Sequence, residues 1–359
     1  MNFSHRLAAV RQKLSRLKAD AFLCSGLSNV RYLTGYTGSA GMALISADGA
    51  WFFTDFRYQT QAKEQVRGYD ILIAKGGLSD KAAQVARKKK LKRVAFEAAH
   101  VTVAAHEAMA KQFKEGELVP SKNVVEELRV IKDEGEIAAI RKAVEIADKA
   151  FNYILGQLRP GRVEREVALE IEEYMIGQGA DGLSFDAIVA SGARSALPHG
   201  KASAKRLEWG DLITFDFGCK YQGYCSDLTR TVCLGKPTSE QQKIYRLVLD
   251  AQKRAEEAIR ADAVCKAVDA AARDYIKAQG YKENFGHGLG HGVGIDIHEA
   301  PRLHWRERGK LKAGQVVTVE PGIYIEGWGG VRMEDMVVVT QNGAEILTRA
   351  PKPARIMAV

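Results

Sequence analysis

The residues that could carry chemistry in this 359-residue chain are two pairs of acids, each pair flanking a short turn-like segment. In the first pair, Asp216 lies in an alternating stretch from Leu212 to Phe217, which is typical of a strand. A turn at Tyr221-Gln222 would place Asp216 directly opposite Asp227 on a second strand. Opposed side chains have Cβ atoms about 5 Å apart, and like charges there are destabilising unless something compensates.

The second pair repeats this arrangement. Glu320 and Glu334 lie on either side of a turn that would be centred on Gly327, a residue type suited to tight turns. Four carboxylates in one partly buried site cannot all stay ionised without cations, and two divalent ions would neutralise them. Each acid taken alone could instead face solvent and pair with Arg230 or Arg332, but solvation does not explain why both segments place acids at equivalent points.

A nitrogen ligand is expected to complete the site, and the histidines supply candidates. His287, His291 and His298 lie near one another in a segment that has glycine at every second position from 286 to 294. This pattern argues against a helix and allows close backbone approach to a bound group. It is not a dinucleotide-binding motif, because position 291 is His where that motif requires glycine.

The ligand types indicate the chemistry. Carboxylate oxygens with one imidazole suit Mn²⁺, Co²⁺ or Zn²⁺ better than a soft-metal site. Two such ions, typically about 3.5 to 4 Å apart, can hold a bridging water, lower its pKa and polarise a carbonyl group. The predicted reaction class is metal-assisted hydrolysis.

An internal repeat would position these residues. The segment from Arg159 to Gly179 resembles that from Arg260 to Gly280, and Gly210 to Gly218 aligns with Gly314 to Gly322. Six residues of the first segment recur 101 positions later: Arg159, Val163, Val167, Tyr174, Gln178 and Gly179. Two copies of one helix-then-strand unit predict a pseudo-twofold domain with a site between its halves.

The first part of the chain has a different organisation. An amphipathic helix is expected near the N-terminus, and short strands are expected at 21–23, 41–45, 51–54 and 94–96. A strongly charged helical segment from about Val124 to Leu158 then begins a new domain. We therefore expect an α/β N-terminal domain over residues 1–122 and a catalytic domain over 123–359.

Composition restricts the class of protein. With 46% hydrophobic and 27% charged residues, the chain is typical of globular proteins rather than disordered ones. Its five cysteines show no Cys-x-x-Cys spacing and are expected to be free thiols in a reducing compartment. Because the sequence has neither a signal-type segment nor eighteen uninterrupted apolar residues, we expect a cytoplasmic protein without membrane insertion.

The net charge of +9 raises nucleic-acid binding as an alternative. The excess is confined to residues 1–122, which contain 20 Lys and Arg against 10 Asp and Glu, including the run from Arg87 to Arg93. No aromatic residues are interleaved with these lysines for base stacking. A solvated helix end is the simpler account, and we expect no nucleic-acid partner.

Taken together, these motifs resemble those of the pita-bread metallopeptidases, the family of methionine aminopeptidase, Xaa-Pro aminopeptidase and prolidase. The matching stretches are Asp216-Phe217-Gly218, Ser226 to Thr231, Gly286-His287-Gly288, His298 to Pro301, Glu320-Pro321-Gly322 and Arg332 to Asp335. Asn29 to Gly35 and Thr54 to Tyr58 resemble the N-terminal domain of the proline-specific branch. The resemblance implies an α/β domain of the creatinase/prolidase type followed by an α+β pita-bread domain with the internal repeat.

The resemblance also implies a role for each candidate residue. The five ligands of two divalent metal ions would be Asp216, Asp227, His291, Glu320 and Glu334, with Asp227 and Glu334 bridging the ions. Mn²⁺ or Co²⁺ is expected, and Zn²⁺ is also compatible. Glu320 would handle the proton of the bridging hydroxide, His298 would support the tetrahedral intermediate, and His199 would line the substrate pocket. His287 and Arg332 would orient the ligands or face the substrate.

The implied activity is hydrolysis of the bond between an N-terminal residue and proline. This bond lacks the N–H that ordinary proteases grip, whereas a dimetal site can hold the carbonyl and the free amino terminus instead. We expect a homodimeric Xaa-Pro aminopeptidase acting on peptides with proline at the second position. The alternatives are an Xaa-Pro dipeptidase (prolidase) and a metal-free amidinohydrolase or binding protein of the same fold, a class that normally lacks several of the five ligands.

Overall fold

The computed structural model describes residues 1–359 and divides into two compact units, Met1–Arg129 and Val130–Val359. The sequence placed this division a few residues earlier, between 122 and 123. The difference arises because the short helix α6 (Glu126–Arg129) is fixed to the first unit. Lys13 Nζ donates to Val124 O at 2.7 Å, and Arg129 Nη1 donates to Asn29 Oδ1 at 2.8 Å.

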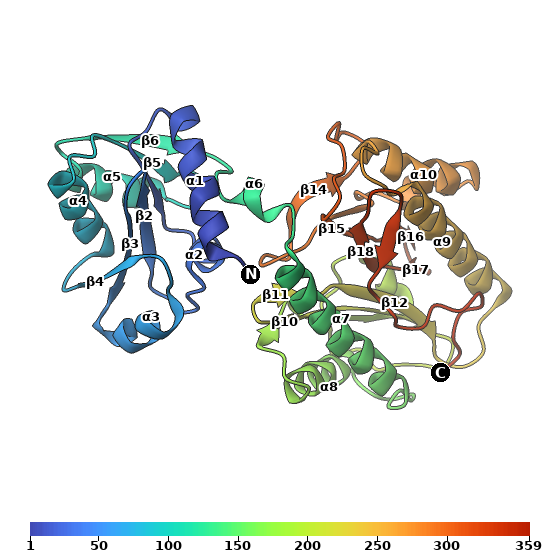
Figure 1. Ribbon diagram of the computed structural model, residues 1–359. Helices are drawn as coiled ribbons and strands as arrows, with labels where there is room; N and C mark the ends of the chain where they lie inside the picture. The colour runs from blue at the N-terminus through green and yellow to red at the C-terminus, as the bar shows by residue number, and fades with distance from the viewer. The chain divides into compact units, whose positions relative to one another are not determined.

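The first unit is built on one six-stranded sheet in the order β4-β3-β2-β1-β5-β6 (Figure 1). Strand β2 pairs antiparallel with β1 and β3, and the other neighbours are parallel. The strands are β1 (Ala21–Cys24), β2 (Met42–Ser46), β3 (Ala50–Asp55), β4 (Asp70–Ala74), β5 (Arg93–Glu97) and β6 (Glu117–Ser121). Their helices are α1 (Phe3–Leu17), α2 (Leu27–Thr34), η1 (Phe56–Tyr58), α3 (Gln59–Gln65), α4 (Leu78–Lys88) and α5 (Val103–Gln112).

The four strands expected from the sequence are the inner ones. They are buried along most of their length, so they read as continuous apolar runs. The outer strands β4 and β6 were not predicted, because their residues are largely half-buried or exposed and β6 contains Pro120. Such residues are typical of sheet edges and carry little strand signal.

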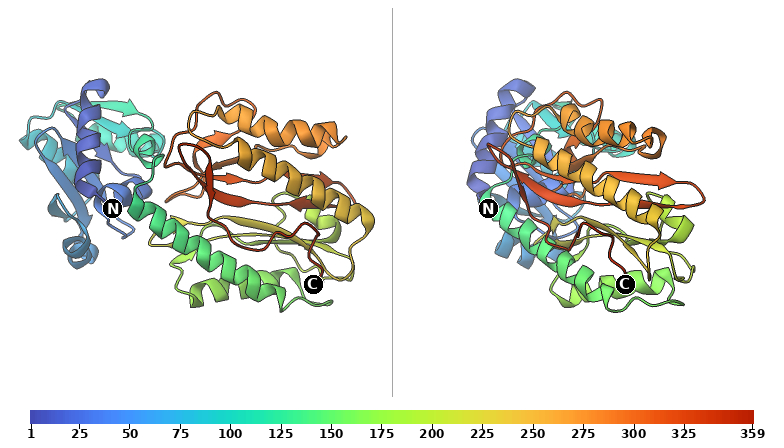
Figure 2. Two further views of the ribbon diagram at one scale, coloured as in Figure 1. Left: turned by 45° about the vertical axis from the view of Figure 1, so that its right-hand side comes forward. Right: turned by 90° about the vertical axis from the view of Figure 1, so that its right-hand side faces the viewer.

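The second unit consists of two halves that each contain two helices followed by a set of strands, as the repeat predicts. The first half contains α7 (Glu134–Leu155), α8 (Glu164–Gly177), β7 (Gly182–Leu183), β8 (Ile188–Ser191), η2 (Gly192–Ala196), β9 (Leu212–Phe217), β10 (Cys219–Tyr221), β11 (Tyr224–Cys225) and β12 (Leu228–Cys233). The second half contains α9 (Ser239–Ala258), α10 (Cys265–Ala278), η3 (Lys282–Asn284), β13 (Gly290–Gly292), β14 (Glu299–Leu303), β15 (Val316–Val319), β16 (Gly322–Ile325), β17 (Gly329–Arg332), β18 (Asp335–Val339) and β19 (Ala344–Ile346). Helices α7 and α9 lie on opposite sides of the strands (Figure 2).

Each half has its own apolar core. Helices α7 and α8 pack on the first-half strands through residues such as Phe151, Ile171 and Phe215. Helices α9 and α10 pack on the second-half strands through residues such as Val248 and Val317. The predicted α+β domain with an internal pseudo-twofold repeat is confirmed, and the strands lie between two layers of helices.

Local signals explain where the long predicted helix begins. Asp133 caps α7 in a capping box, in which its side chain accepts from Glu136 N at 2.9 Å and Glu136 Oε2 accepts from Asp133 N at 3.0 Å. The segment predicted from Val124 to Leu158 is therefore two helices, α6 and α7, separated before this cap. None of the helices has the length and hydropathy required to cross a membrane.

Candidate metal centre

The first acidic pair lies on the β9–β12 hairpin in a register that differs from the predicted one. Asp216 pairs with Thr229, so the expectation that Asp216 faces Asp227 directly is wrong. The chain turns at Gln222-Gly223, whose φ angles are 48° and 76°. This turn is one residue later than expected because a two-residue turn of this type requires positive φ at both positions, which glycine favours.

The two acids nevertheless converge. Asp227 precedes Thr229 by two residues, so it is a diagonal neighbour of Asp216 on one face of the hairpin. Burial raises the pKa of Asp227 well above its ordinary value, and the nearby charges of Glu334 and Asp216 raise it further. The first half therefore contributes both carboxylates to one place.

The second acidic pair has the predicted register. Gly322 pairs with Arg332, and the ladder closes around Gly327, which has a φ of 75°. Glu320 and Glu334 lie between this ladder and the β15–β18 ladder, which has the same register. Burial raises the pKa of Glu334 well above its ordinary value and that of Glu320 to about 7.

His291 of β13 brings a nitrogen to these carboxylates. Its Nδ1 lies 3.0 Å from Gly292 O, and because a carbonyl only accepts, Nδ1 carries the proton. The free Nε2 lies 3.4 Å from Glu320 Oε1 and 3.6 Å from Asp227 Oδ2. Ligand atoms of Asp227, His291 and Glu334 all lie within 4.8 Å of one another.

Arg332 is the cation nearest to the acids. Its Nη2 donates to Asp216 Oδ2 at 2.6 Å, and its Nε donates to Thr229 Oγ1 at 3.1 Å. Thr229 in turn donates to Glu334 Oε2 at 2.9 Å. The arginine pairing considered from the sequence is thus present for Asp216, but one guanidinium does not balance four carboxylates.

The donor set fits divalent cations. Asp216 Oδ1 is buried and has no hydrogen-bond partner, so this oxygen is free to bind an ion. Three of the four carboxylates have raised pKa values, because the site concentrates negative charge away from water. Oxygen donors from both halves plus one imidazole match the preferences of Mn²⁺, Co²⁺ and Zn²⁺.

The other predicted histidines surround this cluster in different ways. The His298 ring packs against His291, with ring centroids 4.4 Å apart, and burial lowers the pKa of His298. His199 is exposed in the segment that follows η2. Both imidazoles are therefore available to a substrate at the cluster.

His287 does not meet the carboxylates but belongs to a hydrogen-bond chain. Its Nδ1 donates to Gly288 O at 2.8 Å, so its Nε2 accepts from Tyr324 Oη at 2.9 Å. Tyr324 Oη accepts from Arg332 Nη1 at 3.0 Å. Burial lowers the pKa of His287 to about 4, and the ring stays neutral near pH 7.

Three residues of this site were missed from the sequence: Thr229, Thr318 and Tyr324. Thr318 Oγ1 accepts from His291 N and donates to Glu320 Oε1, both at 3.1 Å. A signal was available, because each of the three lies two or four residues from a candidate acid in a strand-like segment. At that spacing side chains point to the same face of a strand.

Arg302 was also missed. It pairs with His291 across the β13–β14 ladder, and its charge contributes to lowering the pKa values of His291 and His298. Arg302 is exposed and forms no ion pair with a carboxylate. An unpaired cation therefore lies beside the candidate metal centre.

The glycine-rich segment serves strand packing at two positions. A Cβ atom at Gly290 would lie 2.1 Å from Thr318 O, and one at Gly292 would lie 2.2 Å from Ala300 O. The sequence predicted that these glycines let the backbone approach a bound group. At these two positions the backbone instead approaches the backbone of neighbouring strands. These glycines allow β13, which carries His291, to fit between β14 and β15.

A second cluster of possible ligands lies in the first unit, at Glu97, His100 and Glu126. Its centre is filled by the amide of Asn29, whose Nδ2 lies 2.7 Å from Glu97 Oε1 and 2.7 Å from Glu126 Oε1. Glu97 Oε2 also accepts from Gly26 N at 2.7 Å. This cluster is a hydrogen-bond network that fixes the start of α2.

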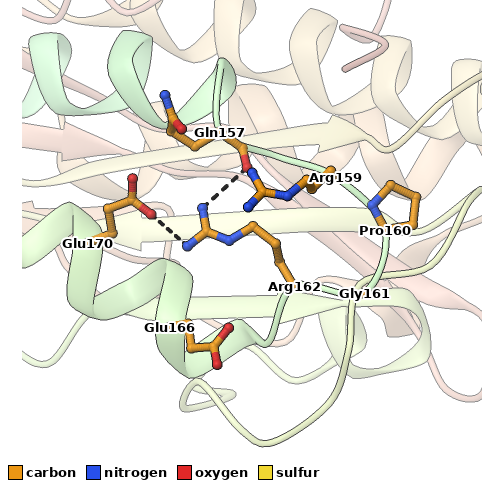
Figure 3. A pocket seen from close by; sticks show the side chains of 7 residues that line it. All are labelled: Gln157, Arg159, Pro160, Gly161, Arg162, Glu166 and Glu170. Atoms are coloured by element: carbon orange, nitrogen blue, oxygen red, sulfur yellow. Dashed lines mark hydrogen bonds and ion pairs between the residues drawn. The ribbon is translucent and has the colours of Figure 1, made fainter.

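A surface hollow of about 610 Å³ lies between the end of α7 and the start of α8 (Figure 3). Its central side chain, Arg162, already donates to Glu170 Oε2 at 2.6 Å and to Gln157 O at 3.2 Å. None of the candidate site residues lines it. The hollow is therefore separate from the metal centre.

Comparisons with known proteins place the chain in a family. The profile of metallopeptidase family M24 matches residues 138–341, and that of the creatinase/prolidase N-terminal domain matches residues 6–131. An uncharacterized peptidase of Bacillus subtilis is 47% identical over 98% of this chain and 100% of its own length. An Xaa-Pro dipeptidase of Pyrococcus horikoshii is 38% identical over 97% of this chain and 98% of its own length.

Solved structures agree with these matches. An Xaa-Pro dipeptidase from Bacillus anthracis has a TM-score of 0.97 and 44% identity, and the match covers 99% of this chain and 100% of that one. An X-Pro aminopeptidase from Thermotoga maritima has a TM-score of 0.90 and 39% identity, covering 97% of this chain and 100% of that one. The resemblance predicted from the motifs is confirmed: this chain belongs to metallopeptidase family M24 and carries a creatinase/prolidase N-terminal domain.

Proposed function

We propose that this protein hydrolyses Xaa-Pro dipeptides with the help of two divalent metal ions. The observation that carries the proposal is the convergence, from both halves of the repeat, of four carboxylates and one imidazole around a single arginine. The ligands would be Asp216, Asp227, His291, Glu320 and Glu334, with Asp227 and Glu334 shared between the ions. Mn²⁺ or Co²⁺ fits this donor set, and Zn²⁺ is compatible with it.

When bound, the ions would activate a water and polarise the scissile carbonyl. The protein's own contribution begins with Glu320, which accepts the proton of the attacking water. Its Oε1 lies 3.4 Å from His291 Nε2, so the carboxylate is within the proposed ligand cluster, where it can take a proton from a bound water. Thr318 Oγ1 holds Glu320 Oε1 at 3.1 Å, so the carboxylate is oriented before the substrate arrives.

The surrounding side chains would bind and orient the substrate. His298 packs against His291 and could donate a hydrogen bond to the oxygen of the attacked carbonyl. The exposed His199 would border the proline ring. Arg332 would hold Asp216 through its hydrogen bond to Oδ2. Tyr324 links Arg332 to His287, and these two residues would orient the arginine.

Arg302 favours a dipeptide over a longer peptide. In an Xaa-Pro dipeptide a carboxylate follows the proline directly, whereas a tripeptide has a neutral amide there. Arg302 lies across the ladder from His291 and has no protein carboxylate to neutralise it. A substrate carboxylate would supply that partner in a charge-assisted hydrogen bond. The dipeptidase names of the Bacillus anthracis and Pyrococcus horikoshii relatives support the same choice.

The aminopeptidase expected from the sequence stays the second candidate, because the relative from Thermotoga maritima is called an X-Pro aminopeptidase. Hydrolysis of Ala-Pro and Ala-Pro-Ala by the Mn²⁺-loaded protein separates the two. We expect kcat/KM at least about tenfold higher for Ala-Pro, a difference of about 1.4 kcal/mol in transition-state stabilisation. Equal or faster cleavage of the tripeptide would favour the aminopeptidase.

The variant Arg302→Gln provides a sharper test. We expect it to raise KM for Ala-Pro about tenfold or more and to leave the weaker cleavage of Ala-Pro-Ala unchanged, because only the dipeptide loses a charged partner. Arg306→Gln is the matched control, since Arg306 is an exposed arginine in the loop after β14. Equal losses on both peptides would show that Arg302 does not recognise the carboxylate.

We also propose that the protein acts as a homodimer in the cytoplasm. All five cysteines are buried and free, which is consistent with a reducing compartment. Light scattering during size-exclusion chromatography tests the oligomeric state, and a mass of one chain at micromolar concentration would contradict the dimer.

A further inference from the structure

A buried ionic network lies behind Glu334 and has no role in the chemistry described above. Asp335, the residue that follows Glu334, is 0% exposed. Its Oδ1 accepts from Arg230 Nη2 at 2.7 Å, and its Oδ2 accepts from Lys352 Nζ. Lys352 Nζ also donates to Glu256 Oε1 at 2.9 Å. The network thus joins β12, β18 and α9 to a segment that follows β19.

Arg230 and its neighbour fix the Glu334 residue itself. Glu334 N donates to Thr229 O at 3.1 Å, and Glu334 O accepts from Arg230 Nη1. Thr229 Oγ1 donates to Glu334 Oε2 at 2.9 Å. Two consecutive residues of β12 therefore hold the N–H, the carbonyl and one carboxylate oxygen of Glu334.

The segment that carries Lys352 meets the second half of the repeat through Lys352 and Glu256, and it is attached to the first half as well. Asp148 of α7 accepts from the backbone N–H groups of Arg349 and Ala350, both at 2.8 Å. Ala350 O accepts from Arg230 Nη2 at 2.8 Å, so the segment also touches the network directly. It is drawn in dark red and passes between α7 and α9 (Figure 2).

We propose that Lys352 is a positioning residue that holds Glu334 in place and thereby sets the affinity of the centre for metal. Lys352 fixes the Asp335 carboxylate, Asp335 orients the Arg230 guanidinium, and Arg230 binds the peptide that carries Glu334. Without the Lys352 cation, the carboxylates of Asp335 and Glu256 would lie buried together with one cation fewer. Among the cations, Arg230 alone would then hold Asp335, and its guanidinium would shift with this carboxylate away from Glu334 O. The inference rests on the proposed role of Glu334 as a ligand.

The test is a calorimetric titration of MnCl₂ into the full chain after its metal has been removed with a chelator. Loss of a residue that orients a ligand typically weakens metal binding about 10- to 100-fold. We expect Lys352→Met to raise the Kd for Mn²⁺ at least about tenfold. Lys352→Arg keeps the positive charge and should restore the wild-type Kd to within about threefold.

A matched lysine separates positioning from general stability. Lys205 forms a 2.6 Å ion pair with Asp211, and its side chain is 25% exposed, compared with 20% for Lys352. Lys205→Met should lower the thermal midpoint without changing the Kd for Mn²⁺. If Lys352→Met lowers the midpoint but binds Mn²⁺ as tightly as the wild type, Lys352 is purely structural and the inference is wrong.

Two further results are informative. If Lys352→Met does not fold, Arg230→Lys takes its place, since an ammonium keeps the charge beside Asp335 but cannot also reach Glu334 O as the second guanidinium nitrogen does. A folded Arg230→Lys protein with wild-type Mn²⁺ affinity would overturn the inference. Failure of the wild-type chain itself to bind Mn²⁺ would instead contradict the proposed function.

Discussion

Glu320 and Glu334 each accept a hydrogen bond from a threonine hydroxyl, but only Glu320 also has the imidazole nitrogen of His291 beside the same oxygen. This oxygen, Oε1, lies between the Thr318 hydroxyl at 3.1 Å and His291 Nε2 at 3.4 Å. Asp216 is held by the permanent charge of Arg332 instead. A carboxylate that is oriented by a neutral hydroxyl, beside the proposed metal site, is suited to accepting a proton from water.

Replacing Glu320 by glutamine tests its role as the acceptor of the water proton. The amide keeps the size of the side chain but cannot accept the proton of water, so kcat on Ala-Pro should fall at least about 100-fold at saturating Mn²⁺. Glu326→Gln is the control, because Glu326 is exposed in the turn of the same hairpin. A Glu320→Gln enzyme with normal kcat and normal metal content would remove Glu320 from the mechanism.

The neutral ring of His287 should make the free energy of unfolding depend on pH. Its pKa is about 4 in the folded chain and near 6.5 when unfolded, so between these values the unfolded chain binds more protons. This residue should therefore reduce the free energy of unfolding as the pH falls from 6.5 towards 4, by up to about 1.4 kcal/mol per pH unit. Urea unfolding at pH 7 and pH 5 should show a weaker pH dependence in His287→Gln than in wild type. His5 is exposed, and the control variant His5→Gln should show the pH dependence of the wild type. If His287→Gln also showed the wild-type pH dependence, the His287 ring would not be neutral in the folded chain.

At the scale of elements, the centre depends on two hairpins and one glycine-rich strand. The second hairpin was predicted in the correct register because Gly327 marks its turn unambiguously. The turn of the first hairpin was predicted one residue too early. Gln222 adopts a positive φ there, a conformation that is not expected of glutamine. Asp227 still lies at the site because the partner of Asp216 changes by two residues, from Asp227 to Thr229. A change of two residues keeps each side chain on the same face of the sheet.

Gly327 allows the importance of the turn to be measured. A Cβ at this position meets no atom within 4 Å, so the cost of Gly327→Ala comes from its φ of 75° alone. We expect a loss of about 1 to 2 kcal/mol in the free energy of unfolding, determined with urea. Gly343→Ala has the same open surroundings without the positive φ and should change stability by less than about 0.5 kcal/mol. Equal effects of the two substitutions would mean that the turn conformation is not strained.

The sequence could predict the order of elements and the candidate ligands, but not the contacts between side chains. Motifs and repeat identify the acids because these features are local in the chain. The roles of Thr229, Tyr324 and Arg302 depend on which strands pair and in which register, and single-residue errors in a turn obscure them. The network around Lys352 includes contacts of Arg230 with residues more than a hundred positions away, and no local sequence pattern predicts them.

At the scale of the whole molecule, the two halves of the second unit are joined at the acids. Each half supplies two carboxylates that repel one another when no cation is bound. Cations that bind only the folded chain should therefore stabilise it, by about 2.7 kcal/mol when free metal is 100 times its Kd. Chelator treatment should lower the thermal midpoint, and Mn²⁺ should restore it. An Asp227→Asn/Glu334→Gln double variant should show no such rise, and an equal rise in that variant would place the stabilising metal elsewhere.

In the proposed function, hydrolysis of an Xaa-Pro dipeptide requires metal at this centre. The most direct measurement is the rate of Ala-Pro cleavage as Mn²⁺ is added stepwise to the metal-free protein, with bound Mn²⁺ counted in the same samples. The rate should be negligible without metal and should reach its plateau as two ions are bound per chain. Full activity in the metal-free protein, or binding of Mn²⁺ without any hydrolysis of Ala-Pro, would contradict the proposed function.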